Sequence, residues 1–444
     1  MKLSGWGRFP IADVQFRKLS SVDNCAHAIE SAYSLIARGQ GRSYGDSALA
    51  EQVLSTQALD HFIHFDSESG LLECEAGVTL DQILKLVVPK GWFLPVTPGT
   101  KFVSVGGAIA SDVHGKNHHH HGTFSKFVTQ FTLLTTEAEK LDVTDSNSAL
   151  FKATCGGMGL TGLILKATIQ LVPIETAYIS QTTLRTKSLE ETLELFEKHS
   201  DSTYSVAWID CLAKGAALGR SLIMLGEHLK LSDTHAQTIQ PDVLKVHTDP
   251  KLTVPIVTPS VLVNPWSMKL FNELYYHKPT KLGLSQIVHY DPYFYPLDAI
   301  NNWNRLYGKE GFVQYQFVVP KSVGVAGLRK VIRAISDSKR GSFLAVLKEF
   351  GEANENYLSF PMSGYTLALD FKVEEGLWPL LESLDQMVLE LGGRTYLAKD
   401  SRMSADTFHA MYAKGIEQLK PVLDEQTKFR SHQSIRLGIQ TTCQ

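Results

Sequence analysis

Glycine and other small residues are concentrated between Thr97 and Gly122, with chargeable side chains among them. Glycines occupy positions 99, 106, 107, 115 and 122, and serine or alanine occupies 104, 108, 110 and 111. Because glycine has no Cβ, a bound group can approach the backbone closely at these positions. His114 and Lys116 stand at the edge of the cluster. We therefore predict a site for a large phosphorylated ligand, which suits a dinucleotide diphosphate better than a free metal ion.

Four consecutive histidines, His118–His121, look at first like a metal-binding tract. Neighbouring residues on a helix or strand point in different directions, however. Tetrahedral zinc sites also space their ligands by about two to five residues. We therefore predict no bound metal, and a solvated loop for His119–His121.

Two more glycine clusters flank the first one. Ala37–Asp46 reads ARGQGRSYGD and looks like a dinucleotide-binding fingerprint, but its Ser43–Asp46 part has turn composition and opens no apolar helix. Cys155–Gly162 reads CGGMGLTG and precedes a predicted strand, Leu163–Val172. Each cluster alone is consistent with an ordinary tight turn. Three of them in one part of the chain favour an extended nucleotide wrapped by several loops.

Hydrophobic periodicity predicts the elements that must position these loops. In the first part of the chain we expect helices over 23–35 and 79–88, the second capped by Thr79, and hairpins over 61–76 and 127–144. Beyond residue 176 the elements become longer and alternate: 189–199, 206–212, 312–319, 324–336, 366–373 and 377–391. This pattern is typical of an antiparallel sheet covered by helices on one face.

The predicted fold class is α+β, and the chain is divided into three parts. Residues 1–175 form a ligand-binding domain with short elements between glycine loops. Residues 176–391 form a substrate-binding domain around the antiparallel sheet. Residues 392–444 are a C-terminal segment that returns to the first domain.

Composition narrows the classes of protein. Lys and Arg number 43 against 46 Asp and Glu, giving a net charge of −3 with no basic block, so we expect no nucleic-acid partner. The N-terminus has no signal-peptide core, and no apolar run of about 18 residues occurs. Five scattered cysteines suit a reducing compartment: Cys25, Cys74, Cys155, Cys211 and Cys443. These features predict a cytoplasmic enzyme.

The stretch Leu252–Pro296 is apolar and aromatic, and its prolines forbid one continuous helix. Trp266–Tyr276 has the spacing of a short amphipathic helix, and Tyr290–Pro296 is dense in aromatic side chains. One interpretation is a subunit interface or ordinary core. The other is a mobile lid that docks on a membrane with its aromatic residues, Trp266, Phe271, Tyr275, Tyr293, Phe294 and Tyr295.

Motifs along nearly the whole chain carry a family resemblance. They are Gly5–Arg8, Gly39–Asp46, Thr97–Thr100, Gly106–Ala110, His114–His119, Gly156–Gly162, Asn301–Asn304, Gln314–Phe317, Phe343–Lys348 and Ala398–Arg402. With these motifs the chain resembles the vanillyl-alcohol-oxidase-type FAD flavoproteins, which have a PCMH-type FAD-binding domain. Within them it is similar to the decaprenylphosphoryl-β-D-ribose 2-oxidases, the flavin half of a ribose-to-arabinose epimerase of cell-wall synthesis. The resemblance weakens between about 175 and 300, the stretch expected to shape the substrate pocket.

The resemblance implies a two-subdomain PCMH-type domain that binds FAD. Arg42 occupies the position where covalent relatives carry a flavin-linked histidine. Arginine cannot form that bond, so we expect noncovalent FAD. The residues implied around the cofactor are Ala37, Arg38, Gly39, Gln40, Gly41, Arg42, Ser43, Tyr44, Gly45, Asp46, Ser47, Gly99, Ser104, Val105, Gly106, Gly107, Ser111, Asp112, Val113, His114, Ile164 and Tyr396.

Around the substrate, the resemblance implies Tyr44, His114, Lys116, Gln314, Gln316, Lys348 and Lys399. The three lysines suit a sugar phosphate electrostatically. Lys399 is the strongest catalytic candidate, and Tyr44 and His114 are alternative proton acceptors or orienting groups. Thr366 and Ala368 stand where the mycobacterial enzymes carry asparagine and cysteine, which leaves the exact substrate open.

The implied activity is FAD-dependent oxidation of a sugar secondary alcohol to a ketone. The favoured substrate is a polyprenyl-phosphoryl-β-D-ribose oxidised at C2, the first half of an epimerisation to the arabinose derivative. The implied partner is an NAD(P)H-dependent short-chain reductase, and the implied location is the cytoplasm with peripheral contact to the inner membrane. The alternatives are an aldonolactone or alditol oxidase that uses oxygen on a small soluble sugar, and a flavin-carrying protein that acts through partner contact.

Overall fold

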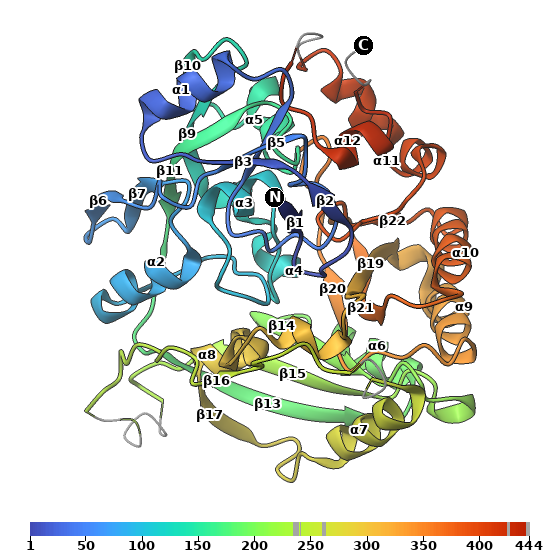
Figure 1. Ribbon diagram of the computed structural model, residues 1–444. Helices are drawn as coiled ribbons and strands as arrows, with labels where there is room; N and C mark the ends of the chain where they lie inside the picture. Colours follow the sequence, from blue (N-terminus) through green and yellow to red (C-terminus); the bar gives the residue numbers. More distant parts are fainter. Residues whose placement is uncertain (234–238, 240, 260–262, 424–426, 441–444) are drawn as a thin grey trace.

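Two halves of the chain form the walls of one cavity in the computed structural model, which describes residues 1–233, 239, 241–259, 263–423 and 427–440 (Figure 1). The N-terminal half, drawn in blue to green in the upper part of Figure 1, holds a three-stranded and a five-stranded sheet. The second half holds an eight-stranded sheet. This mixture of helices and sheets is the α+β class that the sequence predicts.

The three-stranded sheet is parallel and leads into the second glycine cluster. Its order is β3 (Gln15–Lys18), β5 (Gln52–Ser55) and β4 (Leu35–Arg38). Helix α1 (Val22–Glu30) connects β3 to β4 and is shorter than the predicted helix 23–35. It ends early because the Ser31 hydroxyl bonds to carbonyls of its last turn and the chain then enters β4. A small antiparallel pair, β1 (Lys2–Ser4) and β2 (Ile11–Asp13), precedes this sheet.

The five-stranded sheet is antiparallel and contains both predicted hairpins. Its order is β10 (Lys140–Val143), β9 (Val128–Leu134), β11 (Leu163–Gln170), β7 (Leu71–Glu75) and β6 (Phe62–Asp66). Helix α2 (Leu80–Val87) begins at Thr79 in a capping box with Gln82, as predicted. Between these elements lie β8 (Trp92–Phe93), which pairs with β12 (Val172–Pro173), and the short helices α3 (Val105–Ala110), α4 (His118–His121) and α5 (Ala149–Thr154).

The eight-stranded sheet has two unlike faces. Helices α6 (Leu189–Lys198), α9 (Gly324–Asp337) and α10 (Leu377–Glu390) cover one of them, packing on alternate strand residues such as Phe317 and Leu367. Because side chains alternate along a strand, the intervening residues point to the opposite face, which borders the cavity. The strands are antiparallel throughout, in the order β17 (Ser285–His289), β13 (Tyr178–Thr186), β15 (Ser221–His228), β14 (Tyr204–Ile209), β20 (Ala345–Phe350), β21 (Gly364–Lys372), β19 (Phe312–Pro320) and β22 (Arg394–Thr395).

The C-terminal segment lies against the N-terminal half. It contains α11 (Ala405–Leu419) and α12 (His432–Arg436). Phe429 pairs with Leu35 of β4, and Arg436 forms ion pairs with Asp46 and Asp400. These contacts hold the loop after β4 against the turn after β22. The domain boundaries at 175 and 391 stay predictions.

The stretch predicted as a lid contains structures of different kinds. Residues 260–262 of this stretch lie outside the described part of the chain. Among the predicted residues elsewhere, Cys443 also lies outside it. β16 (Leu252–Thr253) pairs with β18 (Ile300–Asn301), and α7 (Pro265–His277) is the predicted amphipathic helix. α8 (Tyr290–Phe294) instead fills the core of the N-terminal half, and Tyr293–Tyr295 are at most 4% exposed. For residues 285–295 the lid prediction is therefore wrong, since β17 is paired in the sheet and α8 is core.

Among the described residues, no helix is both long and apolar enough to cross a membrane.

Candidate functional site

A cavity of about 580 Å³ lies between the two halves. Loops and short helices of the N-terminal half form one side, the glycine wall. The uncovered face of the eight-stranded sheet and the turn after β22 form the other side, the sheet wall. The volume falls within the roughly 300–1,000 Å³ typical of ligand and cofactor sites.

The glycine wall joins all three glycine clusters of the sequence. An added Cβ at Gly99 would meet no protein atom within 4 Å, so it would project into the cavity. At Gly106 it would lie 3.0 Å from the Ala76 Cβ, so that glycine allows α3 to pack closely on the strand side. The glycines that line the cavity are Gly39, Gly41, Gly99, Gly106, Gly107, Gly115, Gly159 and Gly162.

Four successive backbone amides of this wall, those of Gln40, Gly41, Arg42 and Ser43, have no acceptor among the described residues. Gly41 has a φ of 64°, the left-handed region that favours glycine. Successive free N–H groups around such a residue form a concave anion-binding nest. This loop is therefore built to receive a diphosphate.

The start of α3 is different, although the sequence pointed to it first. Its amides are already bonded: Val105 to the Val78 carbonyl, Gly106 to the Ala76 carbonyl, and Gly107 to the Ser104 hydroxyl. The free amides that can bind phosphate thus lie in the glycine cluster at Ala37–Asp46, while the small residues of α3 shape the cavity.

Arg42 brings a cation to the same wall. Its guanidinium lies over the Trp6 ring at 3.9 Å from the centroid and 5.2 Å from that of Phe102. Burial lowers the pKa of this guanidinium, and the nearby Asp298 carboxylate opposes that shift. Arginine still remains charged at any working pH, so an anion bound in the nest gains a positive neighbour.

Most residues predicted around the cofactor line this cavity. They are Ala37, Gly39, Gln40, Gly41, Arg42, Ser43, Tyr44, Ser47, Gly99, Ser104, Gly106, Gly107, Ser111, Val113, His114, Ile164 and Tyr396.

Five predicted residues do not line it, and each is held elsewhere. Arg38 donates to the Ser4 carbonyl at 2.6 Å, and Asp46 pairs with Arg436. Asp112 accepts hydrogen bonds from Asn354, Asn356 and Ser359. Val105 lies in the hydrophobic core, and Gly45 packs against the Asp400 backbone. These five support the loops from behind.

The sheet wall carries the polar side chains predicted for the substrate. Gln314 and Gln316 stand two residues apart on β19, and Gln316 lies opposite Ala368 of β21 in the strand register. Lys348 projects from the neighbouring β20, and Lys399 from the turn after β22. Strand alternation therefore brings Gln314, Gln316 and Lys348 to one face, and the turn after β22 adds Lys399 to it.

Gln314 connects this wall to Tyr44 and to a carboxylate that sequence analysis missed. Its Nε2 donates to Asp370 Oδ1 at 2.6 Å and to the Tyr44 hydroxyl at 3.3 Å. Burial raises the pKa of Asp370 to about 7. Asp370 follows Ala368 by two residues, so strand alternation was the signal that could have found it.

Lys399 and Lys348 are half-buried lysines without a protein acceptor among the described residues. The Lys399 Nζ lies 4.2 Å from the centroid of the Tyr44 ring. Burial lowers the pKa of Lys399 to about 8, with Asp370 opposing the shift. Burial and the nearby Lys399 charge lower the pKa of Lys348 to about 7. Neither lysine therefore has a hydrogen-bond acceptor for its charged form among the described residues.

His114 lies in the wall but is poorly placed to accept a proton. Gln316 Nε2 lies 3.0 Å from His114 Nε2 and 3.2 Å from the Thr366 hydroxyl, which itself donates to the Phe317 carbonyl. Thr366 thus accepts from Gln316, and His114 Nε2 accepts likewise. The other ring nitrogen, Nδ1, is buried without a partner. Burial also lowers the pKa of His114 well below its ordinary value, so the ring is neutral.

Lys116 lines the cavity but already has a partner, because its Nζ donates to the Tyr293 carbonyl. Burial, reinforced by the Lys348 charge, lowers the pKa of Lys116 to about 7. The lysine therefore connects the cavity to the buried helix α8.

The prediction of a solvated loop for His119–His121 is wrong, because His118–His121 form one helical turn, α4. His118 Nδ1 accepts from the Gly351 amide, and the His119 ring bonds to the Ser202 carbonyl at 2.8 Å. The turn thus packs between the halves. No group of His, Cys, Asp or Glu suited to a metal ion occurs within the described ranges.

Sequence analysis also missed part of the far end of the cavity. Trp208 and Val206 of β14 and Met224 of β15 line it, together with Tyr275 of α7. These strands read as buried on both sides, so their apolar pattern gave no signal of a pocket. This end is apolar, unlike the region around Lys399.

Comparisons with known proteins agree with this geometry. Residues 14–144 match the family described as an FAD binding domain. The chain is 40% identical to decaprenylphosphoryl-beta-D-ribose oxidase of Mycolicibacterium smegmatis, over 99% of this chain and 97% of that protein. It is 32% identical to an uncharacterized protein of Streptomyces coelicolor, over 82% of this chain and 100% of that protein. D-arabinono-1,4-lactone oxidase of Kluyveromyces lactis is 26% identical, over 33% of this chain.

The residues present fit FAD. The nest at 40–43 and Arg42 suit its diphosphate, and the open space at Gly99 leaves room for a large planar group. The matched domain contains the wall residues between Ala37 and Lys116, while Trp6, Ile164 and Tyr396 come from outside it. The FAD-binding domain match and the cavity that suits FAD therefore agree that the protein is an FAD-dependent oxidoreductase.

Proposed function

The chain belongs to the FAD-dependent oxidoreductase family that includes decaprenylphosphoryl-beta-D-ribose oxidase, and we propose that it oxidises C2 of a polyprenyl-phosphoryl-β-D-ribose to the ketone. The observation that carries the proposal is the pair of half-buried lysines, Lys348 and Lys399, which have no protein acceptor among the described residues and lie on the wall that faces the cofactor site. Such cations favour an anionic, hydroxyl-rich occupant, and a phosphorylated sugar is both.

Bound FAD supplies the acceptor for the hydride of the carbinol C–H bond. The chain's own residues must hold the sugar and take the hydroxyl proton. Lys399 suits the proton, since a pKa of about 8 leaves part of it neutral near pH 7–8. Tyr44 is less suited, because burial raises its pKa well above 10, so its hydroxyl orients by hydrogen bonding.

The remaining groups of the sheet wall suit binding. Lys348 lies near Lys399 and suits a phosphate or a sugar hydroxyl, and Gln314 and Gln316 offer amides to sugar hydroxyls. Ala368 leaves space beside them. The apolar end around Trp208 and Met224 suits the first carbons of a lipid tail.

The product requires a second enzyme. Oxidation removes the stereocentre at C2, so a reductase must deliver hydride to the opposite face to give the arabinose configuration. An NAD(P)H-dependent short-chain reductase is the partner that we propose, acting in the cytoplasm near the inner membrane.

Anaerobic mixing of the holoenzyme with a short-chain polyprenyl-phosphoryl-ribose tests the proposal. We expect loss of the oxidised flavin absorbance with the ribose lipid and none with unphosphorylated ribose. Bleaching only by an aldonolactone or alditol would replace this proposal with oxidation of a small soluble sugar. Absence of bleaching with every sugar would indicate a flavin-carrying role.

The mode of cofactor attachment gives a separate prediction. Arg42 stands where a histidine would form the flavin bond, and its guanidinium is stacked on Trp6. Acid or heat precipitation should release all yellow colour into the supernatant. Colour that stays with the pellet would show a covalent bond through another residue.

A further inference from the structure

Helix α7 presents an apolar stripe to solvent. Trp266, Leu270 and Leu274 are spaced by four residues and are 83%, 63% and 65% exposed. Residues four apart share one face of a helix, so the three side chains form a continuous ridge. Large exposed apolar ridges of this kind mark interaction surfaces in soluble proteins.

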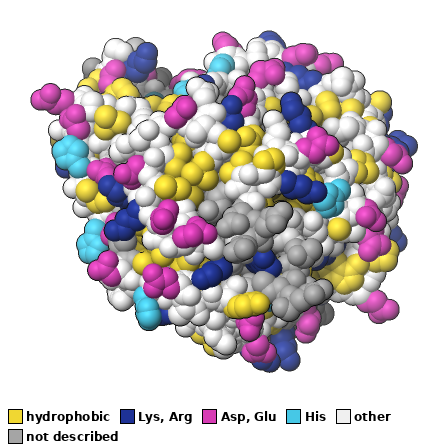
Figure 2. Space-filling view, turned by 90° about the horizontal axis from the view of Figure 1, so that it is seen from above, with side chains coloured by type: hydrophobic (Ala, Val, Ile, Leu, Met, Phe, Trp, Pro, Cys, Tyr) yellow, Lys and Arg dark blue, Asp and Glu magenta, His cyan; other side chains and the backbone are white. Residues whose placement is uncertain are grey.

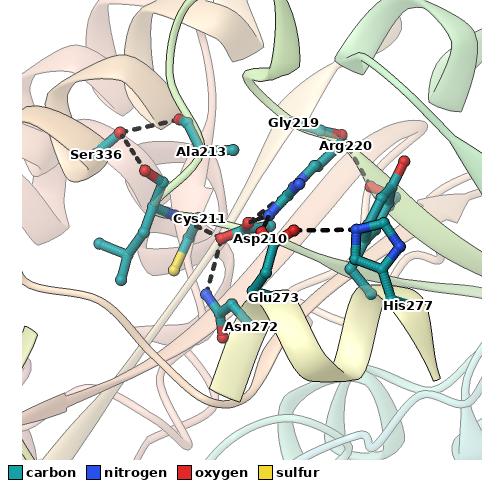
Figure 3. A network of polar contacts seen from close by, with 12 residues as sticks. Asp210, Cys211, Ala213, Gly219, Arg220, Asn272, Glu273, His277 and Ser336 are labelled. Atoms are coloured by element: carbon teal, nitrogen blue, oxygen red, sulfur yellow. Dashed lines mark hydrogen bonds and ion pairs between the residues drawn. The ribbon is translucent and has the colours of Figure 1, made fainter. Parts of the chain in front are cut away.

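Other residues of α7 attach the helix firmly to the sheet (Figure 3). Asn272 donates to Asp210 Oδ1 at 2.8 Å, and Arg220 bonds to the second oxygen of Asp210 at 2.7 and 2.9 Å. Arg220 also pairs with Glu273 at 2.5 Å, and Glu273 with His277 at 3.0 Å. These contacts hold α7 in place on the sheet, so the ridge stands on a fixed helix. A mobile lid would lack such a network.

The charges around the ridge are mostly positive. Lys269 precedes Leu270 on the helix, and Lys278 and Lys281 follow the last turn, all three exposed. Glu273 is the acidic residue of the helix, and Arg220 and His277 already pair with it. An apolar ridge bordered by exposed lysines is complementary to lipid with anionic headgroups.

The ridge is continuous with the apolar end of the cavity. Tyr275 of α7 lines the cavity beside Trp208, with ring centroids 4.8 Å apart. Phe271 stacks on Tyr275 at 5.6 Å and contacts Phe343 edge-on at 5.2 Å, and it is 38% exposed. A chain of aromatic rings thus leads from the cavity to the exposed side of α7.

We propose that the ridge of α7 docks the protein on an anionic lipid bilayer and brings the apolar end of the cavity to the membrane surface. The reason for docking rests on the proposed function, since a lipid-linked sugar must leave the bilayer to reach Lys399. The docking surface itself is inferred from the ridge and the lysines beside it. The face opposite α7 differs: seen from above in Figure 2, acidic and basic side chains intermingle there, with apolar ones in patches between them.

Vesicle sedimentation of the full-length holoenzyme tests this proposal. The vesicles are phosphatidylcholine alone, and phosphatidylcholine mixed with phosphatidylglycerol. The test variant is Trp266→Ser/Leu270→Ser/Leu274→Ser, whose side chains are exposed and whose removal leaves the buried face intact. The matched control is Ile11→Ser/Tyr33→Ser, which removes side chains 61% and 69% exposed from the N-terminal half.

We expect the wild type and the control to sediment with anionic vesicles. The α7 variant should bind at least about 10-fold more weakly, because it loses three apolar side chains that would enter the bilayer. Lys269→Glu/Lys278→Glu/Lys281→Glu should lose the preference for anionic over neutral vesicles. Equal vesicle binding by the α7 variant and the wild type would overturn the proposal. So would a dimer of the wild type that the α7 variant converts to monomer in sedimentation velocity, because the ridge would then bind a second copy.

Flavin bleaching separates this proposal from the proposed function. A short-tailed, detergent-soluble ribose lipid should bleach the wild type and the α7 variant at equal rates, whereas vesicle-bound substrate should bleach only the wild type efficiently. Vesicle docking without bleaching by any ribose lipid would retain the docking surface and reject the substrate.

Discussion

The two walls of the cavity differ in what they offer a ligand: one offers mainly backbone, the other mainly side chains. The glycine wall offers backbone: free amides at 40–43, a φ of 64° at Gly41 and open space at Gly99. The sheet wall offers side chains whose charges are perturbed by burial, Lys348, Lys399 and Asp370. The proposed function therefore assigns binding of the cofactor to the shape and amides of the glycine wall, and the chemistry to the proton affinity of side chains on the sheet wall. Substitutions on the sheet wall should therefore reduce the rate of flavin reduction, and substitutions on the glycine wall should weaken FAD binding.

The largest expected effect comes from the sheet wall. Lys399→Ala should retain FAD and melting temperature but slow flavin reduction by ~10²-fold or more, because a positioned proton-transfer group is lost. Lys399→Arg keeps the charge but cannot accept a proton, so we expect KM to recover and the reduction rate to stay low. Stopped-flow reduction under anaerobic conditions measures both.

Lys330→Ala is the matched control for that variant, since it removes an exposed lysine that pairs with Glu390 on the outer helices. It should reduce at the wild-type rate. Full-rate reduction of Lys399→Ala would remove the lysine from the chemistry and leave the comparison of walls without its main support.

A substitution on the glycine wall should act on affinity instead. At Gly99 an added Cβ would meet no protein atom within 4 Å, and the position lines the cavity, so we expect Gly99→Ala and Gly99→Leu to leave the apoprotein as stable as the wild type. They should weaken FAD binding progressively, with Leu costing about 1–3 kcal/mol, as overpacking does in a filled site. Titration of apoprotein with FAD measures this.

Once saturated with FAD, the Gly99 variants should reduce at near wild-type rates. A large loss of rate with unchanged FAD affinity would contradict the assignment of this wall to the cofactor.

The smallest expected effect is the number of protons taken up when a phosphorylated sugar binds. The pKa values of about 7 for Lys348 and about 8 for Lys399 lie below the ordinary lysine value because burial opposes their charge. An anionic ligand raises both values again, so binding of a phosphorylated sugar at about pH 9 should take up protons. At about pH 6 both lysines are already charged, and uptake from them should vanish.

Calorimetric titration in two buffers of different ionisation enthalpy gives this count. Binding of the phosphorylated ligand with no proton uptake at the higher pH would show that it does not contact these lysines. Lys348→Met should remove part of the uptake and serves as the internal check.

The sequence carried much of the fold because local signals are strong in it. Thr79 with Gln82 specifies the start of α2, and the alternation around β19 and β21 specifies one helix-covered face. The aromatic residues between 266 and 295 show the limit of such signals. Trp266 is 83% exposed and Tyr295 is 1% exposed, although both belong to one apolar stretch. Composition could not separate them, since only packing decides which apolar residues find a core.

The candidate site shows the same division. Residue types and spacing predicted that glycine loops surround an extended nucleotide. The family resemblance implied noncovalent FAD next to Arg42, and lysines and glutamines on the substrate side. Only the tertiary structure decided that the amides of α3 are occupied while those of 40–43 are free. It also placed Asp370 in hydrogen-bond contact with Gln314, and it gave His114 Nε2 a hydrogen-bond donor in Gln316. The physical reason is that hydrogen bonding and desolvation depend on neighbours distant in sequence, which local patterns do not encode.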